Sequence, residues 1–152
     1  MRLSKQLENV SKAIICLYRE LFDESPSPMK LQKLCYYAQG YSLAEKEELF
    51  PEDFQAWQHG PVIPELYYQY QHFQWRQISD DIEPPKCDSL EFLRDIVSAY
   101  GRYDGAALST MTHREQPWFE ARGDLGELEG STEIISKDAL RSYFTSRLKV
   151  HA

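Results

Sequence analysis

Cysteine is scarce in this chain, and the few cysteines are not spaced for cross-linking or for binding a metal. The sequence contains Cys16, Cys35 and Cys87, and no two of them form a Cys-x-x-Cys pair. A disulfide framework uses an even, regularly spaced set of cysteines, and a zinc knuckle uses paired ligands. We therefore expect three free thiols in a protein that resides in a reducing compartment.

Long apolar runs are missing as well. No stretch approaches the ~18 apolar residues that a membrane-spanning helix requires. The first residues lead into an amphipathic segment instead of the apolar stretch that is typical of a signal peptide. The sequence therefore predicts a cytoplasmic protein with no membrane-spanning segment.

Basic residues are in the minority. The chain has 17 lysines and arginines against 24 aspartates and glutamates, which gives a formal net charge of −7 at pH 7. An acidic surface repels nucleic-acid phosphates and anionic lipid headgroups, whereas it attracts and steers a basic protein. We expect protein partners, and we expect neither nucleic acid nor a membrane as a partner.

The motifs of catalysis and cofactor binding are also absent. No His-x-x-x-His or His-Glu-x-x-His pair places two metal ligands on one helical face, and no glycine cluster precedes a Lys-Ser or Lys-Thr pair. We therefore expect no cofactor, no metal and no enzymatic activity. One alternative stays open, a small metal-dependent hydrolase in which the fold would bring together His59, His113 and Glu115.

The chain is long enough and apolar enough to form one compact core. Hydrophobic residues make up 42% of the 152 residues and charged residues 27%, as in ordinary globular domains. Near the N-terminus apolar residues recur at alternating steps of four and three, which predicts a helix of about five turns. These residues are Leu3, Leu7, Val10, Ile14, Leu17 and Leu21. We expect this seam to pack inside the domain, and the alternative is a homo-oligomer in which two chains pair through it.

Capping residues and apolar spacing predict the other helices. Ser27 and Pro28 suit the start of a helix whose apolar and tyrosine residues extend well beyond one face, so this helix should be central. The other expected helices begin at Pro64, Asp88 and Ser136, or cover residues 106–111 and 118–121.

Regular strands are few in this interpretation. Residues 53–58 alternate well enough for a short strand or extended segment, and residues 75–82 are ambiguous between a short strand and a loop. Residues 123–131, with three glycines and several acidic residues, read as an exposed loop. We therefore predict a mainly α fold, a single compact helical domain over residues 1–152 with at most a short β-hairpin or extended segment.

Two short segments combine a histidine, a proline and a tryptophan outside the regular helices, WQHGPV at residues 57–62 and THREQPW at residues 112–118. One interpretation is architectural, because tryptophan fills a core and proline fixes a turn. The other is that the two turns meet and present a recognition surface, because tryptophan and tyrosine are frequent interface anchors. The crowded aromatic residues at positions 67–75 indicate that some aromatic area stays at the surface, where partner sites often lie.

Three blocks of the sequence resemble one known family. The segments LQKLCYYAQGYSLA at residues 31–44 and FQAWQHGPVIPELY at residues 54–67 are similar to the Panacea antitoxin domain, whose phage-associated members include GepA-like and SocA-like proteins. A third block is similar in the pairs Leu108-Ser109, Thr112-His113 and Pro117-Trp118. The sequence departs from the family at His59, where members often carry an aromatic residue.

The resemblance implies an antitoxin, which blocks a protein toxin encoded by the adjacent gene through direct binding. It also implies an alternative, a proteolytic adaptor, because SocA-like relatives deliver the toxin to an unfoldase protease. Some family members carry an added DNA-binding domain, but here one fold uses all 152 residues, so we expect no operator binding by this chain alone. The residues we select for partner binding are Trp57, His59, Gly60, Pro61, Tyr67, His113, Pro117 and Trp118.

Overall fold

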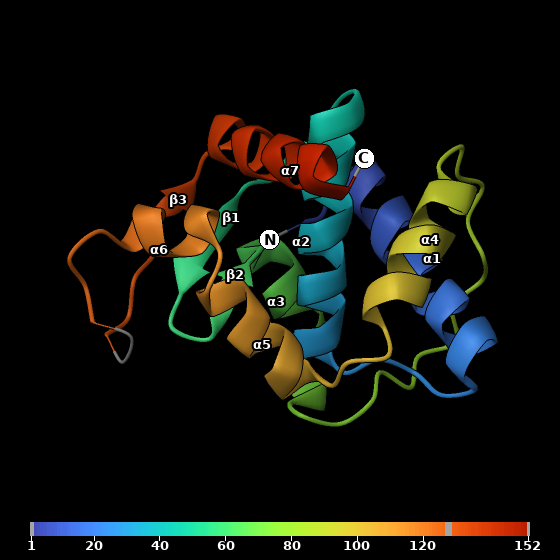
Figure 1. Ribbon diagram of the computed structural model, residues 1–152. Helices are drawn as coiled ribbons and strands as arrows, with labels where there is room; N and C mark the ends of the chain where they lie inside the picture. The colour runs from blue at the N-terminus through green and yellow to red at the C-terminus, as the bar shows by residue number, and fades with distance from the viewer. Residues whose placement is uncertain (1, 127–128, 152) are drawn as a thin grey trace.

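The computed structural model describes residues 2–126 and 129–151, with side chains described up to residue 148. Within these ranges the chain forms seven α-helices, one short 3-10 helix and a three-stranded antiparallel sheet, so the predicted mainly α fold is confirmed (Figure 1). The helices are α1 (Lys5–Phe22), α2 (Pro28–Glu45), α3 (Pro64–Tyr70), η1 (Gln71–Phe73), α4 (Leu90–Tyr100), α5 (Gly105–His113), α6 (Gln116–Arg122) and α7 (Lys137–His151). The strands are β1 (Phe54–Trp57), β2 (Gly60–Val62) and β3 (Ile134–Ile135).

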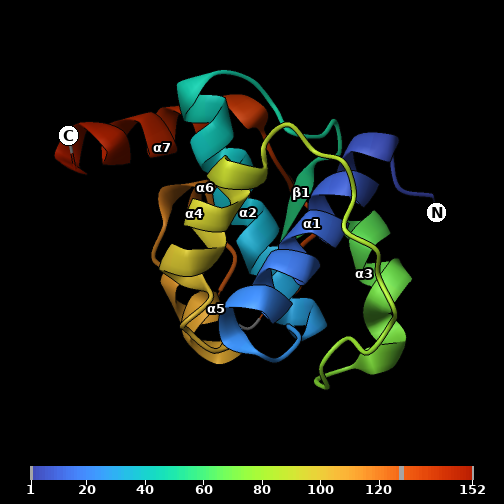
Figure 2. The same cartoon turned by 90° about the vertical axis from the view of Figure 1, so that its right-hand side faces the viewer.

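Helix α2 lies in the middle of the molecule, as the sequence predicts (Figures 1 and 2). Every residue from 31 to 40 is buried, which is the pattern of a helix covered on all sides. The predicted start is confirmed, because the Ser27 side chain accepts a hydrogen bond from the backbone N–H of Lys30 at 3.2 Å and Pro28 occupies the first turn. The other elements are arranged around this helix.

Helix α7 crosses α2 at a glycine. A Cβ atom at Gly40 would overlap the ring of Phe144, so the two helices approach more closely than any larger residue at this position allows. The Phe144 ring is fully buried and makes edge contacts with Tyr36 and Tyr41, at centroid distances of 5.5 Å and 4.7 Å. The predicted cap of α7 is confirmed, because the Ser136 hydroxyl accepts from the N–H of Ala139.

Most of the N-terminal seam is part of the core, whereas Leu21 at its end is 38% exposed. Leu7 and Ile14 are fully buried and Val10 and Leu17 nearly so, where α1 packs against α4 and α2. Pairing of two chains through this seam would require the core to open, so a homo-oligomer has to use another surface. Within the described residues, no helix combines the length and the apolar character needed to cross a membrane.

The small sheet has the order β2-β1-β3, and both pairings are antiparallel. Strand β1 confirms the extended segment predicted at residues 53–58, and its hairpin partner β2 follows after a turn at Gln58 and His59. The third strand, β3, was not predicted. The expected loop at residues 123–131 contains positions 127 and 128, which lie outside the described residues.

Three local predictions need correction or resolution. Residues 112–118, expected outside the regular helices, contain the end of α5 and the first turn of α6. The cap of α4 is Ser89 and not Asp88. Residues 77–82 form no strand, so the ambiguity at residues 75–82 resolves in favour of a loop. The reason is that the backbone carbonyls of this segment bond to a side chain and not to a neighbouring strand. The guanidinium of Arg19, in the last turn of α1, donates to the carbonyls of Ile78 and Asp80 at 2.9 Å and 2.8 Å.

Candidate functional site

The two tryptophan-containing segments lie against each other. The indole N–H of Trp118 donates to the carbonyl of Trp57 at 2.7 Å, and the Ser109 hydroxyl donates to the carbonyl of His59 at 2.6 Å. The Nε2 atom of His113 lies 2.7 Å from the carbonyl oxygen of Gln58. Helices α5 and α6 therefore hold the turn of the β1–β2 hairpin through its backbone.

The second of these segments faces inward. Trp118 and Pro117 are buried, and the His113 ring packs on the Trp118 indole with centroids 4.0 Å apart. The Nδ1 atom of His113 lies against the carbonyl oxygen of Ser109, so both ring nitrogens are occupied by carbonyl groups of the chain. Pro117 and Trp118 are thus buried beneath the hairpin turn, and the half-buried His113 has both ring nitrogens against backbone carbonyls.

Gly60 and Pro61 bring the hairpin onto α2. Gly60 has φ 119°, a conformation that side chains disfavour, and a Cβ atom there would come within 2.8 Å of both Lys33 Cε and Thr112 Oγ1. The carbonyl of Pro61 accepts a hydrogen bond from Lys33 Nζ at 3.1 Å. Glycine is therefore required where the hairpin passes between α2 and α5.

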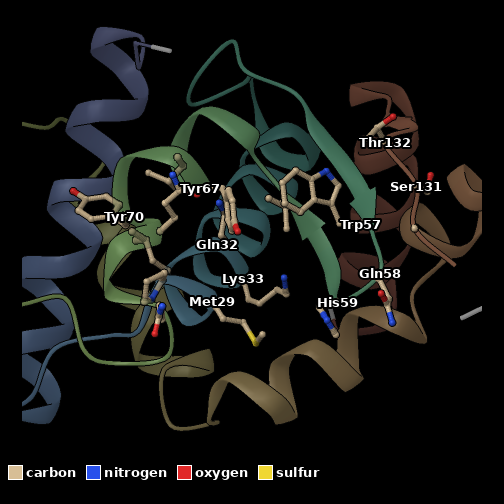
Figure 3. A pocket seen from close by; sticks show the side chains of 17 residues that line it. Met29, Gln32, Lys33, Trp57, Gln58, His59, Tyr67, Tyr70, Ser131 and Thr132 are labelled. Atoms are coloured by element: carbon tan, nitrogen blue, oxygen red, sulfur yellow. The ribbon is translucent and has the colours of Figure 1, made fainter. Parts of the chain in front are cut away.

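A cavity of about 780 Å³ opens between the first turns of α2, the hairpin and α3 (Figure 3). Three of the residues selected from the sequence, Trp57, His59 and Tyr67, lie in its wall. The other five, Gly60, Pro61, His113, Pro117 and Trp118, are not part of the wall. The lining residues are Pro28, Met29, Leu31, Gln32, Lys33, Trp57, Gln58, His59, Val62, Leu66, Tyr67, Tyr70, Gln71, Gln74, Gly130, Ser131 and Thr132.

An aromatic row, formed by Trp57, Tyr67 and Tyr68, begins in the cavity wall with Trp57 and Tyr67 and continues to Tyr68 outside the wall. The Trp57 and Tyr67 rings meet at a centroid distance of 5.0 Å and the Tyr67 and Tyr68 rings at 5.4 Å, both with T-shaped geometry. Tyr67 remains 39% exposed and Tyr68 49% exposed. Edge-to-face packing is a favourable arrangement of aromatic rings, and exposed aromatic rings are typical anchors for a partner.

Lys33 lies in the cavity wall, and sequence reasoning missed it. Its side chain is only 1% exposed, and Figure 3 shows it between Met29 and the hairpin turn that carries His59. Burial lowers the pKa of this amine to about 7. None of the ion pairs found among the described residues includes Lys33. The signal in the sequence was a lysine within the apolar and tyrosine-rich part of the central helix, because lysine is almost never buried without a partner.

Comparison with known families identifies the family of this chain. The model of the family described as "Antitoxin SocA-like, Panacea domain" matches residues 31–119, which is more than half of the chain. The chain belongs to this family. The match begins in α2 and ends in α6, so it covers the hairpin, α3 and most of the cavity wall of this Panacea-domain protein. Neither the curated proteins nor the solved structures that were compared include a match to it.

Two glutamines of the Panacea domain fix the segments around the hairpin, and neither was predicted. The Gln32 side-chain amide donates to the carbonyl of Ile63 at 3.0 Å and accepts from the N–H of Ile63 at 2.8 Å. Seven residues later, Gln39 donates to the carbonyl of Phe50 at 2.8 Å and accepts from the N–H of Leu49 at 2.7 Å. Each amide thus pairs with the backbone as a neighbouring strand would, and together they position both ends of the hairpin against α2.

The alternative metal site does not assemble in this Panacea-domain structure. His59 is exposed at the hairpin turn, the ring nitrogens of His113 lie on carbonyl oxygens, and Glu115 is buried beneath Tyr37, whose hydroxyl donates to it at 2.9 Å. Burial raises the pKa of the Glu115 carboxyl, and the Tyr37 hydrogen bond opposes this rise. Among the described residues, no group of three His, Cys, Asp or Glu side chains is placed to hold a metal ion.

Proposed function

We propose that this Panacea-domain protein is the antitoxin of a toxin–antitoxin pair and that it neutralises its toxin by direct binding at the cavity. The observation that carries the proposal is the cavity itself, which is bordered by the aromatic row and has most of its wall within the family match. Its volume of about 780 Å³ falls in the range of sites that receive a ligand or an inserted protein segment. Trp57, His59 and Tyr67 are the contact residues in this proposal.

The remaining selected residues act through the position of the hairpin. His113 and Trp118 contact backbone carbonyls of the hairpin, and Pro117 is buried next to Trp118. Gly60 and Pro61 allow the hairpin to approach α2 closely. A substitution at any of these five positions would displace Trp57 and His59 together, because both belong to the same hairpin. Their effect on toxin binding is therefore indirect in this proposal.

Charge supports a protein partner with a basic surface. The chain carries a formal charge of −7, which accelerates encounter with a basic toxin and does not favour nucleic acid. Long-range attraction of this kind raises the association rate, whereas the aromatic contacts at the cavity slow dissociation.

The test is co-expression with the product of the adjacent gene, scored by cell growth and by co-purification. We expect the wild-type chain to restore growth and to form a stable complex, and we expect Trp57→Ala and Tyr67→Ala to weaken both. Phe119→Ala is the matched control, because Phe119 is 47% exposed but lies outside the cavity wall.

Two other outcomes contradict the proposal in different ways. Restored growth together with loss of the toxin, reversed by removing the unfoldase protease of the cell, would identify an adaptor that delivers the toxin for degradation. A harmless neighbouring product that does not co-purify would show that direct neutralisation of that partner is wrong.

A further inference from the structure

The cavity wall is neutral to basic in an acidic protein. Although the chain has 24 aspartates and glutamates, none of the described residues that line the cavity is one of them. The titratable side chains in the wall are Lys33 from α2, His59 from the hairpin turn, and Tyr67 and Tyr70 from α3. An anionic group entering this cavity would meet a cation and no carboxylate.

Lys33 has unused hydrogen-bonding capacity. An ammonium group offers three N–H donors, and among the described residues Nζ has one acceptor, the carbonyl of Pro61 at 3.1 Å. The side chain is 1% exposed, so the remaining donors are not solvated as they would be at the surface. A buried cation without an anionic partner costs the fold free energy.

The neighbouring residue shows that the fold does not need a charge to hold the hairpin. Gln32 makes two hydrogen bonds to Ile63 with a neutral amide, only two positions along the chain from the carbonyl that Lys33 contacts. A neutral side chain at position 33 could serve Pro61 equally well. The ammonium is therefore better explained by a group that arrives from outside.

Resting on the proposed function, we infer that the cavity receives a carboxylate of the partner polypeptide, which takes the free donors of Lys33 while its apolar neighbours pack on Met29, Trp57 and Tyr67. A carboxylate fits better than a phosphate, because one ammonium matches one negative charge and most of the wall is apolar. The carboxylate is that of an aspartate or glutamate side chain or of a chain terminus.

The first test does not need the toxin. Lysine Cε resonances of the full-length protein are followed by NMR during titration with hexanoate and, separately, with hexanamide, which has the same stem without the charge. We expect hexanoate to shift the Lys33 signal and to raise the pKa of Lys33 from about 7 toward its ordinary value. Hexanamide should do neither. When the backbone amide signals of the cavity residues are followed in the same titration, Lys33→Met should abolish their response to hexanoate.

The second test measures affinity for the product of the adjacent gene. We expect Lys33→Met to weaken binding by about thirty-fold or more, because removing one partner of a desolvated charged pair leaves the other unpaired. Lys86→Met is the matched control, since it removes the same charge from an exposed position. Removal of the toxin's last residues then separates a terminal carboxylate from a side-chain carboxylate.

The two tests separate failure of the inference from failure of the proposed function. If the wild-type chain binds the toxin and Lys33→Met binds it equally well, the carboxylate inference is wrong and the antitoxin proposal stands. If the toxin does not bind at all, the antitoxin proposal fails, and the comparison of hexanoate with hexanamide still decides what the cavity recognises. Equal responses to these two probes would overturn the inference.

Discussion

Lys33 and Glu115 are both buried ionisable groups next to α2: Lys33 belongs to the helix, and Glu115, just before α6, accepts a hydrogen bond from the hydroxyl of Tyr37 on the same helix. Burial shifts each pKa toward the neutral form, lowering that of Lys33 to about 7 and raising that of Glu115. Their surroundings differ. Glu115 is enclosed beneath tyrosines, with Tyr100 stacked on Tyr37 at 3.9 Å, whereas Lys33 opens onto the cavity. The enclosed carboxyl of Glu115 becomes neutral by binding a proton. The ammonium of Lys33, which lies in a cavity wall, can also be paired with an anionic ligand.

The largest expected effect is loss of the enclosed group. Glu115→Ala removes the acceptor of the buried Tyr37 hydroxyl and leaves an unfilled volume, so we expect the free energy of unfolding to fall by about 2–4 kcal/mol. Urea denaturation at pH 7 measures this. Glu115→Gln is the control, because it keeps an acceptor in the same place, and an equal loss in both variants would contradict this account.

The glutamine variant also tests the direction of the Glu115 pKa. A carboxyl whose folded-state pKa is raised binds a proton more tightly when folded, so its contribution to stability is full below the unfolded value near 4.5 and is lost as pH rises through the folded value. We therefore expect the wild type to gain melting temperature relative to Glu115→Gln as the pH falls from 7 toward 4.5.

At the cavity wall the expected sign is opposite, because removal of the group should stabilise the protein. Lys33→Met replaces an unpaired buried cation by an apolar side chain of similar length, and we expect the free energy of unfolding at pH 6 to rise by about 1–3 kcal/mol. Urea denaturation of the two proteins measures the difference. A marked loss of stability would show that the Lys33 bond to Pro61 is what the fold requires.

A smaller effect follows from the pH dependence of that difference. Below about pH 7 the folded protein holds a charged Lys33, but between 7 and 10.5 the folded state is neutral there while the unfolded state keeps its proton. The unfolded state then binds more protons, so the wild type gains stability as the pH rises. We expect the advantage of Lys33→Met to shrink from pH 7 toward pH 10, as measured by melting temperature, with the tyrosines common to both proteins cancelling.

The helix starts were predictable because their signals are local. Ser27, Pro64 and Ser136 mark helix boundaries through capping or ring geometry within a few residues, and the structure confirms each. The central position of α2 was predictable because its apolar and tyrosine residues extend around all faces. The cap of α4 was placed one residue early, because Asp88 and Ser89 are both good capping residues and the spacing does not separate them.

The cavity was harder to predict, because its wall comes from segments far apart in the sequence. The burial of Lys33 depends on Pro61, which is 28 residues away, and on the passage of Gly60 beside Thr112. The pairing of Gln32 with Ile63 likewise exists only after α2 and the hairpin have met. Strand β3 is two residues long and is defined by the edge of β1, so no pattern within it could reveal it.

The crossing of α7 over α2 at Gly40 has a practical consequence for anyone who transplants this domain. The family match ends at residue 119, but Phe144 fills the surface that α2 presents around Gly40, next to Tyr36 and Tyr41. A graft cut at the edges of the match would expose this aromatic surface to water and invite aggregation. Chimeras that exchange the cavity-bearing part of one Panacea protein for that of another should therefore carry their own final helix, or be designed with a matching ring and glycine.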